Sequence, residues 1–116
     1  MKIICNQKML ANKISIVQKA INGKTTLELL KGILLTAKGD SINLTGYDLE
    51  IGIETYAQAE VIEEGQIVIN SRLFGDIIRK LPSDFINIEV IDGLKIRIYT
   101  DNSQYHLNCL NSEDYP

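Results

Sequence analysis

The sequence predicts a strand that passes directly into a helix in the stretch Val68-Ile69-Asn70-Ser71-Arg72-Leu73-Phe74-Gly75-Asp76-Ile77-Ile78-Arg79-Lys80-Leu81-Pro82. Asn70 or Ser71 can cap the helix N-terminus, and Pro82 ends the helix because it cannot continue the hydrogen-bond ladder. The apolar positions recur at helical spacing: Leu73, Phe74, Ile77, Ile78 and Leu81. The remaining positions are expected to face outward: Arg72, Gly75, Asp76 and Arg79.

The same order of elements opens the chain. Ile3-Ile4-Cys5-Asn6 reads as a strand that leads into a first helix, with Asn6 as the N-cap and Gly23 just past the helix end. A narrow apolar stripe follows the helical period: Leu10, Ile14, Val17 and Ile21. The opposite side of this helix is polar: Lys8, Asn12, Ser15 and Lys19.

Most of the remaining chain alternates between apolar and polar residues, as strands do. The predicted strands are 2–5, 33–38, 41–46, 49–57, 65–70, 86–91, 94–100 and 103–109. Turn residues such as Gly39-Asp40 and Asp92-Gly93 separate them. The order strand, helix, three strands therefore occurs twice. We predict an α+β fold built from a duplicated βαβββ unit, with both helices on one side of a shared antiparallel sheet. No linker interrupts the chain, so residues 1–116 are expected to form a single domain.

Composition is that of a folded domain, with 116 residues of which 45% are hydrophobic and 23% charged. No apolar run is long enough to span a membrane, and the first residues become polar too early for a signal peptide. Cys5 and Cys109 are then expected to be free thiols in a reducing compartment. We predict a cytoplasmic protein with no membrane partner.

The formal net charge of −3 conceals a segregation of charge along the chain. Residues 1–38 carry seven lysines against one glutamate, whereas residues 39–71 carry seven acids and no base. A protein with one cationic face and an acidic exterior would show this pattern. Helices that simply carry solvated lysines would show it as well.

Catalytic motifs are weak in this sequence. Asn22-Gly23-Lys24-Thr25-Thr26 contains the Gly-Lys-Thr of a phosphate-binding loop, but Gln18 stands where that motif requires its first glycine. His106 is the only histidine and has no neighbour at zinc-ligand spacing. The acids Asp48, Glu50, Glu54, Glu63 and Glu64 are more typical of a solvated sheet face than of a metal site. We predict no catalytic residue, no metal and no cofactor.

Several stretches resemble the first domain of the bacterial DNA polymerase III β subunit, the replicative sliding clamp. The two longest are Leu44-Thr45-Gly46-Tyr47-Asp48-Leu49-Glu50-Ile51-Gly52-Ile53-Glu54 and Arg72-Leu73-Phe74-Gly75-Asp76-Ile77-Ile78-Arg79-Lys80-Leu81-Pro82. Shorter ones are Met1-Lys2-Ile3, Gly32-Ile33-Leu34-Leu35 and Glu113-Asp114-Tyr115-Pro116. The resemblance covers essentially the whole chain in register.

This resemblance implies a DNA-clamp fold and a non-catalytic processivity factor for DNA replication. Three such domains form a subunit, and two subunits close head-to-tail into a homodimeric ring around double-stranded DNA. The helices line the hole, and the ring tethers the polymerase. The groove used by the polymerase and the clamp loader lies largely in the third domain, outside this chain.

The resemblance also suggests functional residues. Lys24 and Arg72 match cationic positions that face DNA in the family, and the helical wheels add Lys8, Lys19 and Arg79. The last strand lies at the seam with the other subunit, where we place Tyr105 and Leu107, with His106 on the opposite face. The alternative is a stand-alone binding or oligomerisation module that uses edge strand 103–109 to pair with another protein. An enzyme that uses the Gly-Lys-Thr loop is the third and weakest hypothesis.

Overall fold

A computed structural model describes residues 1–116 and confirms the α+β class. The order of elements is β1 (Lys2–Asn6), α1 (Gln7–Gln18), β2 (Gly32–Lys38), β3 (Ser41–Tyr47), β4 (Gly52–Gln58), β5 (Glu60–Glu63), β6 (Gly65–Asn70), α2 (Ser71–Lys80), β7 (Phe85–Ile91), β8 (Lys95–Tyr99) and β9 (Gln104–Asn108). Two short 3₁₀ turns, η1 (Glu28–Lys31) and η2 (Ser112–Asp114), complete it. Neither helix is long and apolar enough to cross a membrane.

The strands form two antiparallel sheets rather than the single shared sheet that we expected. One sheet has the order β5-β1-β7-β8-β9, and the other has the order β4-β3-β2-β6. Each half of the chain thus contributes its three-strand meander to one sheet and its first strand to the other. Local periodicity shows which face of a strand is buried but not which distant strand lies beside it, so this exchange left no signal in the sequence.

The two sheets are connected at both ends. Ala59 alone separates β4 from β5, and its backbone N–H donates to the carbonyl of Asp40 at 3.0 Å, so one extended segment bends from the first sheet into the second. Beyond β9, Leu110 exchanges two backbone hydrogen bonds with Val68 of β6, at 2.8 and 3.1 Å. Strand β5 was not predicted, because its four residues are too few to display a period.

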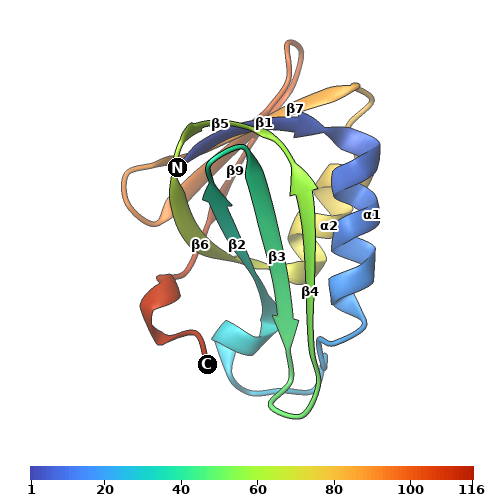
Figure 1. Ribbon diagram of the computed structural model, residues 1–116, viewed down its shortest axis with the longest axis vertical. Coiled ribbons are helices and arrows are strands. Elements are labelled where there is room, and N and C mark those ends of the chain that lie inside the picture. The colour runs from blue at the N-terminus through green and yellow to red at the C-terminus, as the bar shows by residue number, and fades with distance from the viewer.

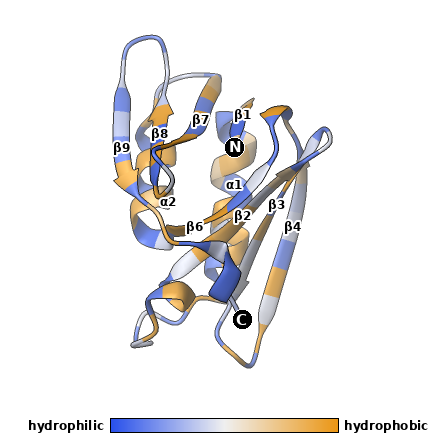
Figure 2. Ribbon diagram, turned by 90° about the vertical axis from the view of Figure 1, so that its left-hand side faces the viewer, coloured by the Kyte–Doolittle hydropathy of each residue, from blue (hydrophilic) through white to orange (hydrophobic).

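A single core joins both sheets to both helices. β3 and β8 are the middle strands of the two three-strand meanders, and each buries alternate apolar side chains: Ile42 and Leu44 on β3, Ile96 and Ile98 on β8. Figure 2 shows hydropathy alternating along β4 and β9, as expected for strands with one face toward the core. Cys5 and Cys109 are both buried and free, as predicted.

The strand predicted over 49–57 begins only at Gly52, because a turn precedes it. The Asp48 carboxylate accepts hydrogen bonds from the backbone N–H groups of Ile51 and Glu50, at 2.7 and 2.9 Å. Leu49 is held at a φ of 80° within this turn. These two hydrogen bonds lower the pKa of Asp48 and make it a turn-forming residue.

Candidate nucleic-acid interface

The two helices lie side by side on one side of the molecule, as predicted (Figure 1). They run antiparallel, since the first residue of α1 and the last turn of α2 are joined by a 2.8 Å hydrogen bond from Gln7 Nε2 to the carbonyl of Ile78. At the other end, Gln18 Nε2 donates to the carbonyl of Ser71 at 3.0 Å. Both charged helix faces therefore belong to one layer.

Both helices begin with the same cap. The side chain of Asn6 accepts from Met9 N–H at 2.8 Å, and that of Asn70 accepts from Leu73 N–H at 3.0 Å. The sequence predicted Asn6 and offered Asn70 or Ser71 for the second helix; Asn70 is the cap. Helix α1 ends at Gln18, earlier than the Gly23 boundary that we expected, and the next residues continue as turns.

Helix α1 presents the polar face that its sequence predicts. Leu10, Ile14 and Val17 are fully buried. The exposed side carries Lys8, Asn12, Ser15 and Lys19. With a rise of about 1.5 Å per residue, Lys8 and Lys19 are about 16 Å apart along the helix axis, so a positive charge lies at each end of this side.

Helix α2 is rotated from the predicted orientation. Leu73, expected on the apolar face, is 41% exposed, and Gly75, expected outward, is buried. A Cβ atom at position 75 would lie 2.7 Å from Gln18 Nε2 and 2.8 Å from an Arg79 guanidinium nitrogen, so a larger residue would displace the ends of these two side chains. Leu73 therefore lies on the solvent side of α2 together with Arg72 and Arg79, which are exposed as predicted.

Arg79 is fixed between the helices. Its guanidinium donates to Ser15 Oγ at 3.1 Å and to Gln18 Oε1 at 2.5 Å, and it lies 3.9 Å from the Asp76 carboxylate. By contrast, Arg72 forms no ion pair or side-chain hydrogen bond and is free to bind a ligand. The helical wheel gave these two arginines the same role, but their surroundings differ.

A pocket of about 350 Å³ lies where the end of α1 meets the start of α2. Its lining contains three cations and one acid among nine residues: Gln18, Ile21, Gly23, Lys31, Asn70, Ser71, Arg72, Asp76 and Arg79. Lys31 was not predicted as a site residue, although it belongs to the lysine-rich first segment; it pairs with Glu28 at 3.2 Å.

The structure brings some predicted cations together and separates others. Arg72 and Arg79 line the same pocket, and Lys24 follows its lining residue Gly23. Lys24 is exposed in a turn that Asn22 holds by accepting its backbone N–H at 2.9 Å. Lys19 projects from the same end of α1, whereas Lys8 lies at the opposite end. No helix follows the Gly-Lys-Thr sequence directly, as a phosphate-binding loop would require.

Strand β9 is an edge strand, bonded only to β8. Tyr105 lies opposite Ile98 and Leu107 opposite Ile96, so both share the core-facing side, and His106 lies opposite Arg97 on the other side. This alternation is as predicted. Tyr105 is 38% exposed, and Leu107 is half-buried against the core.

Comparison with known proteins identifies the family. The model of the DNA polymerase III beta subunit N-terminal domain matches residues 1–116. The chain belongs to this family. The family is a non-catalytic one, which confirms that the chain is not an enzyme. No three His, Cys, Asp or Glu side chains are grouped so as to hold a metal ion.

Relatives and solved structures agree with this assignment. The chain is 32% identical to the beta sliding clamp of Halalkalibacterium halodurans over 124 residues, and 31% identical to that of Bacillus subtilis. Both matches cover the whole chain but 33% of the relative, so this chain spans about a third of their length. The solved Bacillus subtilis clamp superposes with a TM-score of 0.97 at 30% identity, over the whole chain and 33% of the clamp. A putative beta subunit from Eubacterium rectale gives 0.95 at 32% identity, over the whole chain and 32% of that protein.

Proposed function

We propose that the chain forms the first of three domains of a ring-shaped sliding clamp, which encircles duplex DNA without sequence preference and tethers the replicative polymerase. The observation that carries this proposal is the antiparallel helix pair, with exposed lysine and arginine along one side of a clamp-family domain. In such a ring, this helix layer faces the hole. A role at DNA also places the protein in the cytoplasm.

The chemistry of the helix layer suits sliding. A clamp must neutralise phosphates without reading bases, because base contacts would favour one register along the duplex. We assign phosphate contacts to Lys24 and Arg72 at one end of the helix layer, with Lys19 beside them and Lys8 at the far end. Arg79 adds positive charge at the same surface while its hydrogen bonds bind α1.

A DNA-binding measurement tests this assignment. We expect weak, non-specific affinity from a single domain, about 10⁻⁴ M at physiological salt. Lys24→Ala and Arg72→Ala should each weaken binding equally on two unrelated duplexes and reduce the salt slope by about one unit. Lys95→Ala is the matched control, since Lys95 is exposed on β8, away from the helices. If Lys95→Ala lowers the slope as much as Arg72→Ala, the helix layer is not the DNA-facing side.

The ring also requires a seam between subunits, which we place at the open edge of β9. Tyr105 and Leu107 would contribute apolar contacts there, and the free backbone groups of the edge would pair with a strand of the other subunit. This chain alone should then be monomeric or self-associate weakly in light scattering. A stable closed ring formed by the chain alone would contradict the seam.

The alternative proposal is a stand-alone module that uses the same edge strand to bind another protein. It predicts no salt-dependent DNA binding, so the experiment above separates the two. The polymerase and the clamp loader would bind the full-length clamp at a groove outside this chain. The solved Helicobacter pylori clamp is bound to a DNA ligase peptide, an example of a clamp holding a partner segment.

A further inference from the structure

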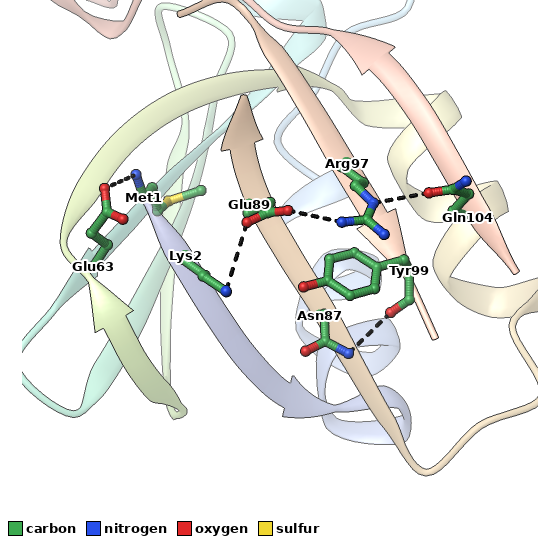
Figure 3. A network of polar contacts seen from close by, with 8 residues as sticks. All are labelled: Met1, Lys2, Glu63, Asn87, Glu89, Arg97, Tyr99 and Gln104. Atoms are coloured by element: carbon green, nitrogen blue, oxygen red, sulfur yellow. Dashed lines mark hydrogen bonds and ion pairs between the residues drawn. The ribbon is translucent and has the colours of Figure 1, made fainter. Parts of the chain in front are cut away.

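The outer face of the five-stranded sheet is divided into two regions. In the first, polar side chains pair across four strands (Figure 3). Glu89 lies 3.9 Å from Lys2 and 3.1 Å from Arg97, and Arg97 donates to Gln104 Oε1 at 2.9 Å. The Arg97 guanidinium also lies 3.8 Å from the centroid of the Tyr99 ring. These groups bind one another, which leaves this region little capacity for a partner.

The second region is apolar and unpaired. Phe85 at the start of β7 is 61% exposed and Ile62 on β5 is 51% exposed. Ile4 on β1 is half-buried. Ile4 lies opposite Asn87 and Phe85 lies opposite Asn6, so Ile4 and Phe85 are diagonal neighbours on the same face. Exposed apolar side chains gathered on one sheet face are typical of an interaction surface.

A pocket of about 650 Å³ opens next to this apolar group. The ladder between β1 and β5 stops at Ile4 and Glu60, so Cys5 and Asn6 have a strand neighbour only on the β7 side. The pocket occupies this gap, where the chain bends from β4 into β5. Its lining is Ile4, Cys5, Asn6, Asp40, Gln58, Ala59, Glu60 and Phe85.

The charged residues that line the pocket are all acidic. Asp40 and Glu60 line it, and Asp84 directly precedes Phe85. All three are exposed, and none of them takes part in an ion pair of the structure. Uncompensated carboxylates around an apolar group repel nucleic acid and attract cations.

We propose that this acidic–apolar surface, defined by Ile4, Ile62, Phe85, Asp40 and Glu60, docks a segment of a partner protein that carries apolar side chains flanked by lysine or arginine. The apolar side chains cover Ile62 and Phe85 and enter the gap beside β1. The basic side chains pair with Asp40 and Glu60. The surface lies on a sheet face and adjoins only the N-terminal end of α1, so the cations assigned to DNA at the other end, Lys24 and Arg72, remain free when the surface is occupied.

A peptide titration of the ¹⁵N-labelled chain tests the proposal. The probe is a short acetylated peptide in which leucine and lysine alternate, and the matched peptide has glutamate for lysine. We expect the lysine peptide to shift the amide resonances of Ile4, Glu60, Ile62 and Phe85, and the glutamate peptide to shift none of them. Phe85→Ser should weaken binding at least tenfold, whereas Tyr56→Ser, at an equally exposed aromatic residue of the other sheet, should leave it unchanged.

A double variant separates charge from apolar contact. Asp40→Asn combined with Glu60→Gln keeps the size of both side chains and should reduce the salt dependence of peptide binding. Shifts spread equally over other acids such as Glu50, or binding that survives Phe85→Ser, would overturn the proposal. So would concentration-dependent shifts of the same resonances without peptide, because a second copy of the chain would then be the occupant.

Discussion

Gly46 is the position where a single added methyl group should most disturb the packing of α1 against β3. It is buried on β3, directly beneath the end of the helix. A Cβ atom there would lie 2.5 Å from the carbonyl oxygen of Val17, 3.3 Å from its carbonyl carbon and 3.2 Å from Ile21 Cγ1. The closest obstacle is helix backbone, which cannot rotate away as a flexible side chain can.

The size of the effect follows from these distances. Real Cβ atoms essentially never approach a heavy atom closer than 3.0 Å, so α1 must move by at least about half an ångström over a close-packed core. Overpacking of this kind costs about 1–3 kcal/mol. For a domain of this size, we expect Gly46→Ala to lower Tm by about 4–12 °C. The moving end of α1 carries Lys19 and leads to Lys24, so DNA affinity should fall as well.

Thermal and urea unfolding followed by circular dichroism would measure this loss. Gly23→Ala is the matched control, because a Cβ atom at Gly23 meets nothing within 4 Å. The control should leave stability unchanged or raise it by about 0.4–1 kcal/mol through a less flexible unfolded chain. A Gly46→Ala protein within about 0.5 kcal/mol of the parent would refute the packing argument.

Three other predictions concern the caps, the arginines and the buried thiol. Asn6→Ala and Asn70→Ala should each lower the free energy of unfolding by about 1 kcal/mol in urea titrations, because each removes the acceptor for a first-turn amide. Arg79→Gln should lower the free energy of unfolding by about 1 kcal/mol and change the salt slope of DNA binding little. Arg72→Gln should reduce that slope and leave the free energy of unfolding unchanged. Equal slopes for the two variants would contradict this. Burial raises the pKa of Cys5 from 9.0 to about 12, so the native chain holds a proton that the unfolded chain releases, and stability should fall as pH rises from about 9 to 12. Cys5→Val should flatten that fall when the two proteins are compared by urea unfolding across the same pH range.

The predictable part of the fold is the part with a local signal. Asn6 marks a helix start because a cap acts within one turn, and the spacing of Leu10, Ile14 and Val17 reports which face is buried. The alternation of Ile42 and Leu44, and of Ile96 and Ile98, likewise predicts the two central strands. Each of these signals depends on residues that are close in the sequence.

The remaining features depend on distances between elements that are far apart in the chain. Leu73 suits an apolar face by its spacing, but it is exposed because α2 is oriented with Gly75, beside the side chain of Gln18 of α1, on its buried side. Arg72 and Arg79 have similar positions on the helical wheel. Arg79 joins the two helices because Ser15 and Gln18 of α1 accept its hydrogen bonds, whereas Arg72 has no such partner. The basic character of the layer was therefore predictable, but the division of roles within it was not.

The exchange of first strands between the two halves has a consequence for folding. β1 completes the sheet of the second half and β6 completes that of the first, so neither half encloses a core by itself. Residues of both halves must meet before any sheet is whole, which favours an all-or-none transition and slow, topology-limited folding. The arrangement is also that of a domain-swapped pair within one polypeptide, because each βαβββ unit gives its first strand to the sheet of the other.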